Sequence, residues 1–195
     1  MTDDLTTPQT TDTRASRRRT VRALCAALAV AGSGLGALAA PAAAHEITGP
    51  ISGETRAALA QVRAATAGYH DLDAALADGF VRGTECVSNP HGPGAMGVHY
   101  VDMSRLATGF EPNRPEVLIY EPQEDGRMRL VGVEYVVVDA DQDPATDERP
   151  VFPGGVTFHA PHPGPGPVLY TLHAYVWKNN PAGMFVDYNP RNSCP

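Results

Sequence analysis

A carboxylate and several imidazoles lie in stretches of the chain that have the pattern of β-strands. Glu134 interrupts residues 128–138, whose two alternating faces are both mostly apolar, so its side chain is predicted to be buried. A lone buried carboxylate is costly unless a cation compensates its charge. The cation is either a metal ion or the guanidinium of Arg127 or Arg129, and the sequence leaves both alternatives open.

The chain has seven histidines, several of them in or beside predicted strands. A histidine on an apolar strand face is commonly a hydrogen-bonded core residue. Two histidines and a carboxylate on strands can instead bind Fe, Mn, Zn or Cu and leave positions open for water, which suits metal-assisted hydrolysis or oxidation. We therefore expect one divalent transition metal, with ligands drawn from these residues: His99, Glu134 and His173, and as a further ligand His159 or His162.

Residues 92–97 match the spacing of a dinucleotide-binding loop, Gly-x-Gly-x-x-Gly. Such a loop follows a strand and opens a helix, whereas this one follows a proline-containing loop and precedes a predicted strand. No nucleotide cofactor is expected, and the glycines are predicted to let His99 turn inward. The chain also contains no nucleophile elbow and no Walker loop, which argues against serine hydrolases and P-loop enzymes.

An acidic loop after residue 138 has carboxylates at positions 1, 3, 5 and 9 of a possible calcium loop. Proline occupies positions 6 and 12, where an EF-hand needs glycine and glutamate, so an EF-hand is excluded. A looser calcium loop and a solvated acidic loop both stay open. The residues concerned are Asp139, Asp141, Asp143, Pro144, Asp147 and Pro150.

Residues 1–44 have the organisation of an export signal. Residues 16–22 are arginine-rich and resemble a twin-arginine motif, residues 23–40 are weakly apolar, and small residues end the segment at Ala44. A spanning helix is the alternative for the apolar run. Cleavage after Ala44 would leave a mature chain of residues 45–195, secreted or otherwise extracytoplasmic, with no stable membrane span. Its first residue, His45, would be a candidate copper ligand.

Three cysteines are present, and Cys25 would be removed with the signal. In an exported protein the remaining two, Cys86 and Cys194, are predicted to form a disulfide bond. The alternative is that they bind a metal, but they are far apart and have no Cys-x-x-Cys spacing.

The formal charge of −7 argues against a nucleic-acid partner, which requires a basic surface. The 19 glycines and 18 prolines favour many turns. Helical periodicity is confined to residues 53–78, with a break near Gly68 and possible caps at Ser52 and Asp71. Strands are predicted at residues 99–101, 115–121, 128–138, 156–159 and 168–178. We expect one α+β domain over residues 45–195, a helical segment packed on a mostly antiparallel sheet or small β-barrel.

Residues 94–100, 115–122, 130–135 and 180–185, together with Cys194, resemble a family of small exported bacterial proteins of unknown function. The resemblance spans most of the chain after Arg56. It implies secretion and a compact α+β domain, and it implies no catalytic role for any residue.

Two classes of function follow from the sequence. The first is an exported metal protein, with or without catalysis. The second is an extracytoplasmic binding or structural module whose polar residues serve folding alone. Convergence of His99, Glu134 and His173 on one point would favour the first class.

Overall fold

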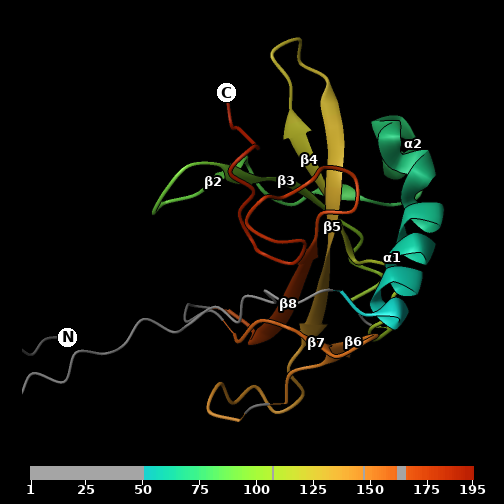
Figure 1. The fold of residues 1–195 in the computed structure, drawn as a ribbon, viewed down its shortest axis with the longest axis vertical. Helices are drawn as coiled ribbons and strands as arrows, with labels where there is room; N and C mark the ends of the chain where they lie inside the picture. Colours follow the sequence, from blue (N-terminus) through green and yellow to red (C-terminus); the bar gives the residue numbers. More distant parts are fainter. Residues whose placement is uncertain (1–50, 107, 147, 162–165) are drawn as a thin grey trace, which may run out of the picture. The chain divides into compact units, whose positions relative to one another are not determined.

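The computed structural model describes residues 51–106, 108–146, 148–161 and 166–195 (Figure 1). The predicted signal segment, His45, Asp147 and His162 therefore lie outside the described residues. All described residues belong to one compact unit. Among them, no helix combines the length and the apolar character that crossing a bilayer requires.

Three short helical elements come first in the chain: α1 (Gly53–Thr66), the 3₁₀-helix η1 (Ala67–His70) and α2 (Leu72–Ala77). The Ser52 hydroxyl accepts a hydrogen bond from the Thr55 amide at 3.0 Å, and the Asp71 carboxylate accepts one from the Asp73 amide at 3.0 Å. Each cap satisfies an amide that the first turn leaves without a partner. Both predicted caps and the break near Gly68 are confirmed.

The strands are antiparallel and form an open sheet in the order β1-β3-β4-β5-β8, with β2 also paired to β3. A separate two-stranded sheet joins β6 to β7. The α+β expectation is confirmed, and of the two forms proposed for the sheet the described residues adopt the open one. The strands are β1 (Val81–Arg82), β2 (Val87–Ser88), β3 (Ala95–Val101), β4 (Val117–Pro122), β5 (Met128–Val138), β6 (Val151–Phe152), β7 (Val156–Thr157) and β8 (Leu169–Ala174).

Strand β5 has the predicted bounds. The other four predicted strands differ from their predicted ranges, by one or two residues at an end in β4 and β7 and by more in β3 and β8. Strand β3 begins at Ala95, earlier than predicted, because Gly97 and its neighbours conceal the strand pattern in the sequence. Strand β8 ends at Ala174, because the chain then turns and both Trp177 and Lys178 donate their amides to the Val131 carbonyl.

The two faces of the sheet have different coverings. Helix α1 packs on one face, where Leu59 and Val62 join Leu118, Tyr120 and other side chains in the main hydrophobic core. The irregular segment after β8 lies across the other face, which includes a smaller buried cluster of Ile119, Val131 and Tyr175. Figure 1 shows the helices and this C-terminal segment, drawn in red, on opposite sides of β5.

Two glycines of the Gly-x-Gly-x-x-Gly motif at residues 92–97 allow close approach to β3. Gly94 admits the C-terminal segment after β8, and Gly97 admits β4. A Cβ on Gly94 would lie 2.2 Å from the Asn189 carbonyl oxygen, and one on Gly97 would lie 2.5 Å from the Tyr120 carbonyl oxygen. Both glycines also have positive φ angles, +92° and +124°, which side chains disfavour. Close backbone packing thus explains two of the three glycines in this motif, Gly94 and Gly97.

Cys86 and Cys194 are joined by a disulfide, with their Cα atoms 5.6 Å apart. This finding removes the alternative in which the two thiols bind a metal. The bond ties the loop before β2 to the end of the C-terminal segment, across 108 positions of sequence.

Removing this cross-link should destabilise the protein substantially, because a disulfide that closes so long a loop strongly reduces the conformational entropy of the unfolded chain. We expect the Cys86→Ser, Cys194→Ser double variant to lose about 4 kcal/mol of unfolding free energy. Urea denaturation of the double variant and of the oxidised wild type measures the difference. A loss below about 1 kcal/mol would show that the cross-link contributes little.

A second buried carboxylate lies on the helix-covered face, in alternation with Leu118 and Tyr120. Glu116 is 1% exposed, and one of its oxygens accepts a hydrogen bond from the Val136 amide at 3.1 Å. Burial raises the pKa of Glu116 to about 7, although Arg105 and Arg114 act in the opposite direction. The side chain is therefore largely protonated below neutral pH.

This raised pKa predicts a pH-dependent stability. Between pH 4.5 and about 7 the folded state binds a proton that the unfolded state releases, so unfolding free energy falls as pH rises through this window. Glu116→Gln should remove this component and stabilise the protein at pH 8 by up to about 3 kcal/mol relative to pH 5. Denaturation at the two pH values tests it, with the exposed Glu111→Gln as control. Parallel pH profiles for the wild type and Glu116→Gln would contradict the assignment.

Candidate metal centre

Three of the side chains that the sequence predicts as ligands meet on the face covered by the C-terminal segment. His99 comes from β3, Glu134 from β5 and His173 from β8, and each offers a ligand atom within 4.8 Å of the others. His99 and His173 are 6% and 2% exposed, and the Glu134 side chain is 12% exposed. The group could therefore hold a metal ion in a largely buried position.

The register of the sheet brings these residues together. Glu134 pairs directly with His173 across β5 and β8, so their side chains lie on the same face. His99 pairs with Ile119 on β4, and Ile119 pairs with Gly132 on β5, two residues before Glu134. Since side chains two apart share a face, His99 reaches Glu134 diagonally over β4.

Both histidines turn the same ring nitrogen toward the carboxylate. His99 Nε2 lies 3.6 Å from Glu134 Oε2, and His173 Nε2 lies 3.9 Å from Glu134 Oε1. These separations are too long for hydrogen bonds. The two rings lie edge to face with their centroids 5.8 Å apart.

The other ring nitrogen of each histidine faces a residue outside the group. His99 Nδ1 is 3.1 Å from the Thr84 hydroxyl oxygen, which also accepts a hydrogen bond from the His99 amide. His173 Nδ1 is 3.0 Å from Asp187 Oδ1, within hydrogen-bond distance but without the N–H alignment of a hydrogen bond. Asp187 belongs to the C-terminal segment.

The two imidazoles have opposite pKa shifts. Burial lowers the pKa of His99, and the nearby Glu134 carboxylate offsets only part of this effect. Burial also lowers the pKa of His173, but the Glu134 and Asp187 carboxylates outweigh it, so that this pKa is raised. Burial raises the pKa of Asp187, and its interactions with His159 and His173 reverse the shift and lower it. His173 thus lies between two carboxylates that favour positive charge.

The other predicted ligands have different positions. His159 contacts Asp187 through its Nδ1, 2.7 Å from Oδ1, and does not join the group of three. His162 lies outside the described residues. The suggested arginine partner Arg127 pairs with Asp125 at 2.7 Å, while the ion-pair contacts of Glu134 among the described residues are the two histidines.

The acidic loop after β5 uses its carboxylates to fix its own backbone. Asp141 accepts a hydrogen bond from the Asp143 amide, and Asp143 accepts one from the Ala145 amide, each at 2.9 Å. Asp139 is 2% exposed, and neither of its carboxylate oxygens has a hydrogen-bond partner among the described residues. In the part of the loop that is described, these carboxylates do not form a group with metal-binding spacing.

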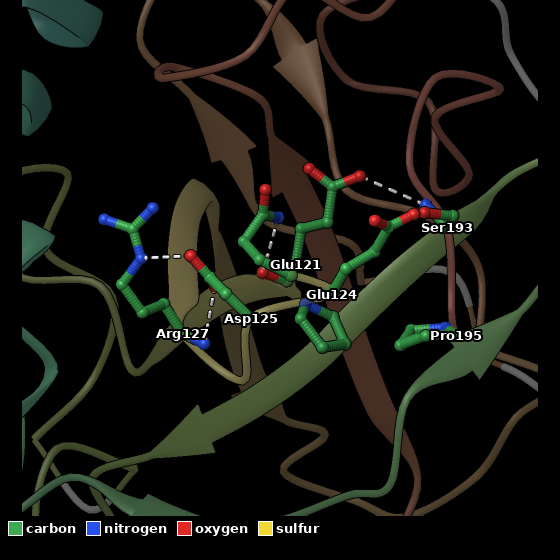
Figure 2. A pocket seen from close by; sticks show the side chains of 8 residues that line it. Glu121, Glu124, Asp125, Arg127, Ser193 and Pro195 are labelled. Atoms are coloured by element: carbon green, nitrogen blue, oxygen red, sulfur yellow. Dashed lines mark hydrogen bonds and ion pairs between the residues drawn. The ribbon is translucent and has the colours of Figure 1, made fainter.

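A partly open pocket of about 520 Å³ lies at the β4–β5 hairpin, and its lining includes no residue of the His–Glu–His group (Figure 2). Its charges are largely paired within the protein. Both oxygens of Glu121 accept hydrogen bonds from Lys178, and Asp125 pairs with Arg127. Figure 2 shows the further bond from the Ser193 amide to Glu121, at 3.1 Å. The ring nitrogens of His173, by contrast, have no hydrogen bonds among the described residues, which favours the His–Glu–His group over this pocket as the functional site.

Comparisons of the chain with protein-family models, with curated proteins and with solved structures found no match. The assignment of this site therefore depends on its own geometry.

Sequence reasoning did not find Asp187 or Thr84, the residues that face the outer nitrogens. Asp187 lies in a segment without regular structure, where hydrophobic periodicity carries no information about direction. Thr84 lies between two strands of two residues each, too short to give a pattern. The one available signal was the location of Asp187 two residues after the buried Phe185.

Proposed function

We propose that the mature chain is an extracytoplasmic protein that binds one divalent transition metal through His99, Glu134 and His173. The observation that carries this proposal is the convergence of two Nε2 atoms and a carboxylate in a buried space without hydrogen bonds between them. His173 Nε2 is also buried without a hydrogen-bond partner among the described residues. Buried polar atoms normally have partners, and an ion would supply one.

The separations support an ion rather than a direct ion pair. Ligands about 2.1 Å from one tetrahedral ion lie about 3.4 Å from each other. The nitrogen–oxygen separations of 3.6 Å and 3.9 Å exceed this value by only a few tenths of an ångström. A carboxylate forming a simple ion pair with imidazolium would approach to below 3 Å.

The donor set is that of Fe, Mn, Zn or Cu sites. Imidazole suits each of these metals, and two histidines with one carboxylate leave coordination positions open. A bound ion would supply Lewis-acid or redox chemistry at those positions. The protein's part is to hold the three ligands on strands of one sheet and to exclude bulk water with the C-terminal segment.

Export is the second part of the proposal. The arginine-rich start and the small residues before His45 support it, as does the resemblance to small exported proteins. The disulfide is consistent with an extracytoplasmic location, since thiols in the cytosol are kept reduced. A twin-arginine route would export the folded protein, with any metal already bound.

Metal content and its dependence on Glu134 test the metal site. Protein purified from its own periplasm or medium should contain about one equivalent of a transition metal, and a chelator should lower its unfolding temperature. Glu134→Gln should reduce metal affinity more than about 100-fold, since it replaces a ligand rather than an outer residue. Elemental analysis and chelator competition measure both effects.

The matched control is Glu116→Gln, which alters a buried glutamate on the opposite face and should leave metal affinity unchanged. Less than about a tenth of an equivalent of metal, with stability insensitive to chelator, would contradict the site. The second class of function, a binding or structural module, would then be favoured.

The export prediction is tested by intact mass. The protein collected outside the cytoplasm should begin at His45 and should have no free thiol under non-reducing conditions. Replacing Arg17 and Arg18 with lysine should block its appearance there if the twin-arginine route is used. A collected protein that retains residues 1–44 would refute cleavage.

A further inference from the structure

The geometry points to Asp187 as the positioning residue of His173: its carboxylate fixes the ring so that Nε2, and not Nδ1, is the metal-binding atom. This inference rests on the proposed metal site and adds a residue from outside the ligand set. Asp187 Oδ1 lies 3.0 Å from His173 Nδ1, while His173 Nε2 faces Glu134 from the opposite edge of the ring. Imidazole bound to a metal through one nitrogen commonly donates its other N–H to a carboxylate.

Burial makes this contact consequential. His173 is 2% exposed, and neither of its ring nitrogens has a hydrogen-bond partner among the described residues. Asp187 Oδ1 is likewise buried without a hydrogen bond among the described residues, although His159 Nδ1 lies 2.7 Å from it. The two unmet atoms are already at hydrogen-bond distance, so alignment of the Nδ1–H toward Oδ1 satisfies both of them. The same tautomer leaves the lone pair on Nε2 for an ion.

The structure holds Asp187 in place through its backbone. The Tyr175 hydroxyl donates to the Asp187 carbonyl at 2.7 Å, and the Tyr175 ring stacks on His173 with 18° between the planes. The Asn180 side-chain amide donates to the carbonyls of Val186 and Tyr188 on either side, at 3.2 Å each. Asp187 is thus positioned without help from an ion, as a preorganised outer residue must be.

His99 has an equivalent partner. Its Nδ1 faces the Thr84 hydroxyl at 3.1 Å, and its Nε2 faces Glu134. The hydroxyl oxygen has two lone pairs, so it can accept the Nδ1–H as well as the His99 amide. Both histidines therefore direct the same nitrogen inward, each with its Nδ1 opposite an oxygen acceptor from another segment.

The experiment compares Asp187→Asn with His159→Gln, using Co²⁺ or Zn²⁺ alone as the probe. Both variants alter one member of the Asp187–His159 pair, but only the first replaces the negatively charged carboxylate that faces His173 with a neutral amide. We expect Asp187→Asn to weaken metal affinity 10- to 100-fold and to change the visible spectrum of bound Co²⁺. His159→Gln should leave both unchanged, and Asp187→Glu should restore part of the affinity.

The outcomes separate this inference from the proposed function. If the wild type binds no Co²⁺ or Zn²⁺, the proposed function fails and this inference fails with it. If the wild type binds and Asp187→Asn matches it in affinity and spectrum, only the role of Asp187 is overturned. Equal losses in Asp187→Asn and His159→Gln would also overturn it.

A measurement on the wild type covers the case in which Asp187→Asn does not fold. Nitrogen-15 NMR of the metal-loaded protein reports which nitrogen of His173 carries the proton. A protonated Nδ1 with a metal-bound Nε2 supports the assignment, and a metal-bound Nδ1 overturns it.

Discussion

The burial of Glu134 within an otherwise apolar strand is the constraint on which the non-helical face of the sheet depends. Strand β5 lies between β4 and β8 and is buried on both faces along much of its length, so a carboxylate there loses most of its hydration. The side chains that face it come from two other strands, His99 and His173. Neither histidine approaches closely enough to form a hydrogen bond. The sheet thus holds these groups beyond hydrogen-bond distance of one another, and this separation differs from that of a closed ion pair.

The segment that covers this face is irregular, yet many of its polar groups have partners in the protein. Asn189 exchanges two backbone hydrogen bonds with Ala95, at 3.1 Å and 3.2 Å, and its side chain donates to the Asn179 carbonyl. The Asn192 amide donates to the Met96 carbonyl at 2.9 Å. Side-chain amides here replace the regular backbone ladder of a strand, because the prolines of this segment cannot donate to one. The result is a hydrogen-bonded cover without regular secondary structure.

Local patterns in the sequence were enough to locate the helix start at Ser52, the bounds of β5 and the buried position of Glu134. Alternation also implied that His173 shares a strand face with other inward residues, and the predicted strands at 99–101, 128–138 and 168–178 placed all three converging groups on strands in advance. Alternation alone could not show that β5 pairs with β8 in the register that sets Glu134 opposite His173, since pairing depends on the whole sheet. The role of Asp187 could not be predicted for a different reason. In an irregular segment, tertiary hydrogen bonds determine where each side chain points, and these cannot be read from local sequence patterns.

The disulfide has a consequence for the order in which the site is assembled during synthesis. Cys86 comes two residues after Thr84, and Cys194 comes seven residues after Asp187, so one covalent bond joins the two segments that face the outer nitrogens. Both Asp187 and Cys194 follow every strand of the sheet in the chain. A nascent chain that has released β8 therefore contains all three inner groups but not yet the cover or its cross-link. In chain order the strands therefore precede the segment that covers His99, Glu134 and His173, and the bond that fixes this segment can form only after Cys194 has been synthesised.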